Sequence, residues 1–178
     1  MTELPEIWLD LSSFIEDKKS SEFEAKIDKK FPYREERFRL SRPFQGKIKI
    51  QKTYLKRNLV AHFDIKITVN FRCDRCLARF DRKIRLKFSR LIKPEANDEE
   101  IELSSNNQVE VFEPIWQELI LHIPPRILCR PDCKGICPIC GTNWNEKSCP
   151  HQKEVMMQEE KRPTPLAQIK EMWQKKQK

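Results

Sequence analysis

Five of the seven cysteines and one histidine lie within 23 residues, and this cluster constrains the fold more than any other feature. Its members are Cys129, Cys133, Cys137, Cys140, Cys149 and His151. Two thiolates separated by two residues bind one ion because the tight turn directs both sulfurs inward, at about 2.3 Å from the metal. Gly141, directly after Cys140, permits the positive φ that such a turn uses. The spacing favours a zinc-bound loop over disulfides or a reactive thiol pair.

A second Cys-x-x-Cys pair, Cys73 and Cys76, brings the potential ligands to eight, enough for two tetrahedral sites. The pair lies between two expected strands, whereas a thioredoxin-type redox pair lies where a strand enters a helix, so we favour metal over redox chemistry. The preferred partition gives one zinc ion to Cys137, Cys140, Cys149 and His151, and a second to Cys73, Cys76, Cys129 and Cys133. The alternative is a single site made of Cys73, Cys76, Cys137 and Cys140.

Charge is strongly segregated along the 178 residues, whose formal net charge is +8. Residues 47–93 hold 15 basic and 3 acidic side chains, whereas residues 94–124 hold 8 acidic and no basic ones. A concentrated basic block attracts polyanions such as nucleic acid, although a charged run is more often a solvated face. The candidate RNA-binding residues are Lys66, Arg72, Arg75, Arg79, Arg82, Lys83, Arg85 and Lys87.

Nothing in the sequence indicates export or membrane insertion. Residues 1–11 lack a basic start followed by an apolar run, and no apolar stretch approaches the length of a membrane span. Seven cysteines without an export signal indicate a reducing compartment in which thiols stay free for metal. We therefore expect a cytoplasmic protein with no membrane partner.

Period-two alternation marks the clearest strands, over residues 61–73 and 80–88. Shorter strands are expected at residues 7–11, 38–40, 48–54 and 109–112, and an exposed loop at 94–108. Phe23, Ile27 and Phe31 recur at four-residue spacing and indicate a helix over residues 20–30.

A longer helix is expected to begin at Pro114 and to cover the sheet with an apolar face made of Ile115, Trp116, Leu119, Ile120 and Ile123. Residues 152–162 are polar, as a linker is, and a terminal amphipathic helix follows from Thr164. The expected class is α+β: an antiparallel, partly barrel-like sheet with a covering helix and a C-terminal zinc-bound loop. The expected parts are residues 1–124, the zinc-binding loop 125–152, and the linker and terminal helix 153–178.

No pattern of catalytic residues is evident. A catalytic metal needs an open coordination position and a nearby acid or base, and the His-x-Glu of zinc deaminases is absent. Phosphate-loop and dinucleotide signatures need several glycines, and the chain has three. We therefore expect structural zinc, no enzyme activity and no small-molecule substrate.

Three segments resemble the YceD family of large ribosomal RNA subunit accumulation proteins. They are Cys73-Asp-Arg-Cys76-Leu77, the run from Cys133 to Asn145, and the closing Pro163-Thr-Pro-Leu-Ala-Gln-Ile169. The family's loop has a leucine where Trp144 stands and commonly a cysteine where His151 stands, and a histidine preserves ligation. The resemblance covers most of residues 40–173. It implies a role in synthesis, processing or stability of 23S ribosomal RNA, with no assigned catalysis.

These observations together lead us to expect a non-enzymatic ribosome-biogenesis factor. Its basic hairpin would bind ribosomal RNA or a pre-50S particle. One alternative is a thiol-based or redox protein that uses Cys73 and Cys76. Another is a protein-binding adaptor whose residues 94–124 recruit basic ribosomal proteins.

Overall fold

The computed structural model describes residues 5–17, 19, 21–30, 32–40, 42–53, 58–97, 99–161 and 173. The chain divides into two compact units. The first comprises Met1–Arg72 and Arg79–Ile127, and the second comprises Cys73–Ala78 and Leu128–Lys178. In the described part of the chain, no helix is long and apolar enough to span a membrane. The three-part division expected from the sequence stays a prediction.

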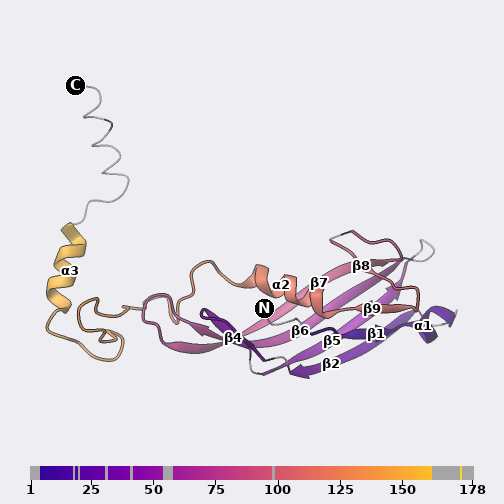
Figure 1. The fold of residues 1–178 in the computed structure, drawn as a ribbon, viewed down its shortest axis with the longest axis horizontal. Coiled ribbons are helices and arrows are strands. Elements are labelled where there is room, and N and C mark those ends of the chain that lie inside the picture. The colour runs from indigo at the N-terminus through magenta and orange to yellow at the C-terminus, as the bar shows by residue number, and fades with distance from the viewer. Residues whose placement is uncertain are drawn as a thin grey trace. The chain divides into compact units, whose positions relative to one another are not determined.

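The first unit is built on a mostly antiparallel, seven-stranded sheet that curves like half a barrel (Figure 1). Its strands are β2 (Glu22–Lys30), β3 (Tyr33–Arg34), β4 (Phe38–Leu40), β5 (Pro43–Lys52), β6 (Leu59–Arg72), β7 (Arg79–Lys93) and β8 (Ile101–Glu102). β6 is central, because β5 and β4 pair with successive parts of one edge and β7 pairs with its whole length. Only β8 joins in parallel, next to β7.

The rest of this unit consists of short strands and two helices. A separate two-stranded sheet pairs β1 (Trp8–Asp10) with β9 (Gln108–Glu110), and α1 (Ser12–Glu16) follows β1. Helix α2 (Phe112–His122) follows β9 directly. The carboxylate of Glu110 accepts hydrogen bonds from the backbone N–H groups of Phe112 and Glu113, at 2.7 and 2.8 Å. Glu110 thereby pairs two of the N–H groups that the start of a helix leaves unpaired.

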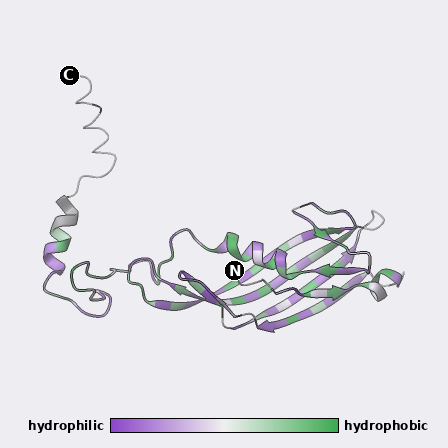
Figure 2. Cartoon of the chain, viewed as in Figure 1, coloured by the Kyte–Doolittle hydropathy of each residue, from purple (hydrophilic) through white to green (hydrophobic). Residues whose placement is uncertain are grey.

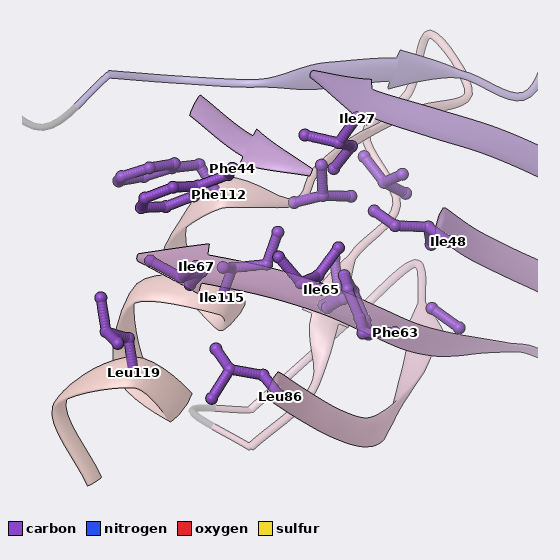
Figure 3. Packing of buried hydrophobic residues seen from close by; sticks show 14 of the residues in the cluster. Ile27, Phe44, Ile48, Phe63, Ile65, Ile67, Leu86, Phe112, Ile115 and Leu119 are labelled. Atoms are coloured by element: carbon purple, nitrogen blue, oxygen red, sulfur yellow. The ribbon is translucent and has the colours of Figure 1, made fainter. Parts of the chain in front are cut away.

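The hydrophobic core lies between the concave sheet and α2. Apolar and polar residues alternate along the strands (Figure 2), so that one row of β6, from Phe63 to Phe71, is buried. From α2, Phe112, Ile115 and Leu119 point toward this row (Figure 3). Phe112 stacks on Phe44 with ring centroids 5.9 Å apart. Each such side chain contributes about 1.5–3 kcal/mol when fully buried.

The prediction of a helix over residues 20–30 is wrong, because Glu22–Lys30 is strand β2. A spacing of four residues puts side chains on one face of a helix, and also on one face of a strand because four is a multiple of two. Phe23, Ala25 and Ile27 form that inward row, opposite Ile50, Ile48 and Gly46 of β5. Phe31 lies outside the described residues.

Three further expectations are corrected in this unit. The segment 94–108 is not all loop, because Ile101 and Glu102 form β8 and Ile101 is buried. Helix α2 begins two residues before Pro114. Pro114 therefore lies in the first turn, where backbone N–H groups have no partner within the helix and proline's lack of one is tolerated. Ile120 was expected on the buried face of that helix, but it is 42% exposed.

The second unit has little regular structure. Helix α3 (Gln152–Lys161) occupies the segment expected to be a linker, and it begins directly after His151. The polar sequence of this segment indicated a linker, and among its described side chains only Val155 is buried. Its Gln, Lys, Glu and Met residues are all good helix formers. The expected terminal helix, apart from Trp173, lies outside the described residues.

Candidate metal centres

The structure brings together one group of four cysteines from two distant segments. Cys73 and Cys76 meet Cys129 and Cys133, and the four sulfurs all lie within 4.8 Å of one another. The Sγ atoms of Cys73 and Cys133 are 3.8 Å apart, and those of Cys76 and Cys129 are 3.7 Å apart. Cys73, Cys76 and Cys133 are buried. The distances are those of sulfurs arranged around a common centre.

A second group is local in sequence. Cys137, Cys140, Cys149 and His151 each offer one ligand atom, and these atoms also lie within 4.8 Å of one another. The two groups are the two sets of the partition preferred from the sequence. The rival set, which joins Cys73 and Cys76 to Cys137 and Cys140, is not among the groups formed by the residues that the structure describes.

The two Cys-x-x-Cys turns have the same backbone geometry. In each turn the first cysteine's carbonyl accepts a hydrogen bond from the N–H four residues on, that of Leu77 (3.0 Å) or Gly141 (2.9 Å). In each turn the first cysteine's N–H donates to the carbonyl five residues on, at 2.9 Å. Leu77 and Gly141 both have positive φ, 60° and 71°. The two turns are therefore two copies of one knuckle, one of which has leucine at the position that favours glycine.

The four sulfurs of the first group are poised to share a cation. Burial acts to raise the pKa of Cys73, but N–H donors of Cys76, Cys129 and Arg75 lower that pKa to about 6. Burial raises the pKa of Cys76 to about 12. The thiolate of Cys73 therefore forms readily, whereas burial raises the pKa of Cys76 and Cys129 and opposes their ionisation. A divalent metal ion reverses this opposition, because a coordinated thiol loses its proton outright.

Side chains around the ligands donate hydrogen bonds to the sulfurs. The Asn145 side chain donates to Sγ of Cys133 at 3.4 Å, and the Trp144 ring N–H donates to Sγ of Cys149 at 3.3 Å. Two neighbouring residues thus serve different groups. In the second group the Thr142 hydroxyl lies 3.1 Å from Sγ of Cys140, and its hydrogen bond is the main cause that lowers the pKa of Cys140 to about 6.

An orphaned polar atom tests whether the second group suits a metal. Nδ1 of His151 is buried and has no hydrogen-bond partner among the described residues. A buried ring nitrogen without a partner is costly unless something binds it, and imidazole nitrogen is a common zinc ligand. Each group supplies four protein ligands, which is the number of a closed, structural tetrahedral site. Both groups therefore fit a metal ion of this kind.

Six of the eight candidate RNA-binding residues lie on one face of the β6–β7 hairpin. Two cross-strand pairs place like charges directly opposite each other, Lys66 with Arg85 and Arg72 with Arg79. Lys83 and Lys87 lie in the same row of β7, opposite Thr68 and Asp64. We call this convex, polar side of the sheet the outer face; the core lies on the other.

Two of the eight residues are placed elsewhere. Arg82 is opposite the buried Val69 and lies over the ring of Phe80, 5.6 Å from its centroid, so it belongs to the inner side. Arg75 is in the second unit, where its guanidinium donates to the carbonyl oxygen of Cys133 at 2.8 Å. Arg82 shares the inward row of Ile84, Leu86 and Phe88, and Arg75 lies in the turn between the two strands.

Sequence reasoning missed three residues that contribute to these sites. Asn145 and Thr142 donate to sulfur, and the signal that could have identified them is their place in the run from Cys133 to Asn145. Arg42 was also missed. It reaches the outer face through an ion pair with Asp81 of β7, at 2.9 Å, although 39 residues separate the two.

Comparison with models of known families matches residues 61–172 to the family described as "Large ribosomal RNA subunit accumulation protein YceD". The matched region is more than half of the chain, and it contains all eight candidate ligands and all but the first two residues of the β6–β7 hairpin. No curated protein and no solved structure matched the chain.

Proposed function

Because the chain belongs to the YceD family, we propose that it is a non-enzymatic factor that supports the synthesis, processing or stability of 23S ribosomal RNA. It would act in the cytoplasm by binding ribosomal RNA or a pre-50S particle through the outer face of the β6–β7 hairpin. The two groups of ligands would hold structural Zn²⁺. In this proposal the metal stabilises the second unit and takes no part in a reaction.

The observation that carries the proposal is the pairing of like charges on the outer face. Basic residues oppose basic residues in four cross-strand pairs: Lys26–Lys47, Arg34–Arg39, Lys66–Arg85 and Arg72–Arg79. No two acidic residues are directly opposite each other in the paired strands that the structure describes. Like charges in direct opposition destabilise a sheet, and a bound polyanion removes that repulsion.

Several basic side chains of this face are already engaged, and this favours a backbone contact over base recognition. Arg85 makes a two-point ion pair with Asp64, at 2.7 and 2.6 Å, and Arg72 pairs with Glu36. The engaged guanidinium groups are held in fixed positions with N–H groups remaining. Contacts of this type bind phosphates and position an RNA without reading its sequence.

Depletion of the protein tests the role in the cell. We expect less 23S RNA and fewer large subunits on sucrose gradients, with small subunits unaffected. Complementation by the full chain should restore the profile. Normal large subunits and normal 23S RNA after depletion would contradict the proposal.

Binding of purified full-length protein to 23S fragments tests the interface. Affinity should fall steeply between about 50 and 200 mM salt, because each neutralised phosphate releases counterions. Salt-insensitive binding, or none, would contradict an electrostatic interface. The redox alternative is tested in the same preparation, because metal-held thiols stay unreactive until a chelator is added.

An acidic hollow supports a second candidate function, that of an adaptor for basic ribosomal proteins. The hollow has a volume of about 350 Å³ and is lined by Trp8, Arg90 and five glutamates, among them Glu99, Glu102 and Glu113. A carboxylate-rich pocket beside a half-exposed indole suits a lysine or arginine side chain. Pull-down of purified basic ribosomal proteins by the wild-type chain but not by Glu99→Lys/Glu102→Lys would favour this candidate.

A further inference from the structure

We propose that the outer face contains a built phosphate-binding notch, lined by Arg42, Lys66, Lys83 and Arg85, that holds one or two backbone phosphates of the RNA. This inference rests on the proposed RNA-binding function and specifies where that binding is anchored. The notch is a hollow of about 500 Å³ that also includes Gln45 and Thr68 in its lining.

The notch arises from a break in strand pairing. On one edge of β6, the register with β5 ends at Gln45↔Lys66, and the register with β4 begins at Leu40↔Val69. Four chain positions separate Leu40 from Gln45, whereas only two, Ile67 and Thr68, separate Lys66 from Val69. The pairing along this edge is therefore interrupted by a bulge. Bulges of this kind redirect side chains and are common beside functional sites.

The bulge brings four cationic groups from three strand regions to one place. Lys66 comes from β6, Lys83 and Arg85 come from β7, and Arg42 comes from the segment between β4 and β5. Carboxylates outside the lining hold both arginines: Asp81 binds Arg42 at 2.9 Å, and Asp64 binds Arg85. Neither lysine's ammonium group has a hydrogen bond or an ion pair to any described residue. The notch thus has two fixed arginines and two unengaged ammonium groups.

A neighbouring hollow shows why this one suits an anion. It also has a volume of about 500 Å³, and it shares Gln45, Lys66 and Arg85 with the notch. Its lining includes Asp28 and Asp64, whereas the lining of the notch includes no acidic residue. Acidic side chains in a lining oppose phosphate, and a lining whose only charged side chains are cationic attracts it. The two hollows therefore share lining residues, but only the notch suits an anionic ligand.

The chemistry of the lining indicates phosphate. Arginine presents a planar fork of N–H groups that matches phosphate oxygens, and lysine binds phosphate as a point charge. The lining contains no aromatic side chain on which a base could stack. The ligand is therefore a phosphate group rather than a nucleobase, and we assign it to the RNA backbone.

The test compares two double variants of the full-length protein that remove equal charge. Lys66→Ala/Lys83→Ala empties the notch of its unengaged lysines. Lys19→Ala/Lys29→Ala removes two exposed lysines that do not belong to the outer face, since Lys19 precedes β2 and Lys29 lies opposite the buried Phe44. Affinity for a 23S fragment is measured as a function of salt, and thermal unfolding checks that both variants fold. A separate titration with inorganic phosphate distinguishes a backbone phosphate from a free anion.

We expect the notch variant to bind RNA about tenfold more weakly, with a salt slope reduced by about 2, because each phosphate contact contributes about 1 to that slope. The salt slope of the control variant should fall by less than about a third of that amount, as expected for a general change of charge. Equal losses in the two variants would overturn the notch while leaving RNA binding intact. Failure of the wild type to bind RNA would instead overturn the proposed function. Tight binding of inorganic phosphate with unchanged RNA affinity in the notch variant would also overturn the assignment.

Discussion

The two units of this chain are stabilised in different ways. Among its described residues, the first has a core of 24 buried hydrophobic residues, most of them from the seven-stranded sheet and α2. The buried cluster around Trp144 in the second unit has three members, Cys137, Trp144 and Val155, with Cys149 packed against it. A cluster of that size contributes only a few kcal/mol of hydrophobic stabilisation, against about 1–2 kcal/mol of backbone entropy for every residue that is ordered.

The burial of apolar side chains is therefore sufficient to fold the first unit but not the second. The second unit compensates with two groups of four ligands and with side chains that donate to the sulfurs. Structural zinc sites supply folding free energy directly, as in small domains that are unfolded without their metal.

Removal of metal should have the largest effect, and it should act on the second unit alone. Apparent binding free energies for structural zinc are about 10–16 kcal/mol, far more than the small apolar cluster provides. After a chelator is added, amide hydrogen exchange should become fast in residues 129–151 and stay slow in β6. Zinc added back should restore protection. Loss of protection in β6 to the same extent would show that the two units do not differ in this way.

Core truncation should have the converse effect on the first unit. Leu86 is fully buried and Leu91 is 40% exposed, and both lie on β7. Leu86→Ala should lower the free energy of unfolding by about 2–5 kcal/mol, because it removes buried surface and leaves a cavity. The matched control Leu91→Ala should lower it by less than about 1 kcal/mol. Zinc content should be unchanged in both, and loss of metal from Leu86→Ala would argue against independent units.

A crossed pair of variants should separate the two metal groups. Asn145→Ala removes a donor to Cys133, and Thr142→Val removes a donor to Cys140 without changing side-chain volume much. Loss of an outer-shell partner typically weakens metal binding about 10- to 100-fold. Competition with a chelator should therefore show one weakened equivalent in each variant. The weakened group should differ between the variants, and weakening of both groups by either change would contradict separate sites.

The smallest effect should come from the knuckle that has leucine at positive φ. Leu77→Gly should stabilise the second unit by about 1 kcal/mol, because glycine adopts this conformation without steric penalty. Gly141→Ala should destabilise the equivalent knuckle by a similar amount, because alanine is strained at the positive φ of this position. The added Cβ meets no other atom, so the backbone conformation is the whole cause. Metal-dependent melting of the second unit measures both. A stabilising Gly141→Ala would show that the knuckles are not equivalent.

The strongest patterns in the sequence predicted their elements correctly. Alternation over residues 61–73 predicted most of β6 because period two over that length fits only a strand with one buried face. The ligand grouping was predictable for a different reason: two sites of four use every thiol and His151. The family resemblance is confirmed by the match over residues 61–172.

The remaining features depend on the register of distant segments. The spacing of Phe23 and Ile27 suits a helix and a strand equally, and the partner strand β5 decides between them. The bulge opposite Ile67 and Thr68 results from two different registers along one edge of β6, which no local pattern encodes. The hydrogen bond from Asn145 to Cys133 likewise requires a loop closed over 12 residues.

The division of the chain between units fixes the order in which it can mature during synthesis. Cys73 and Cys76 leave the ribosome long before their partners, since 53 residues separate Cys76 from Cys129 and 60 separate Cys73 from Cys133. All the strands of the first unit and α2 precede Cys129. The nascent sheet is therefore complete before the first ion can gain its full set of ligands. If the first group holds zinc as proposed, the ion is captured only after the residues of the sheet have been synthesised.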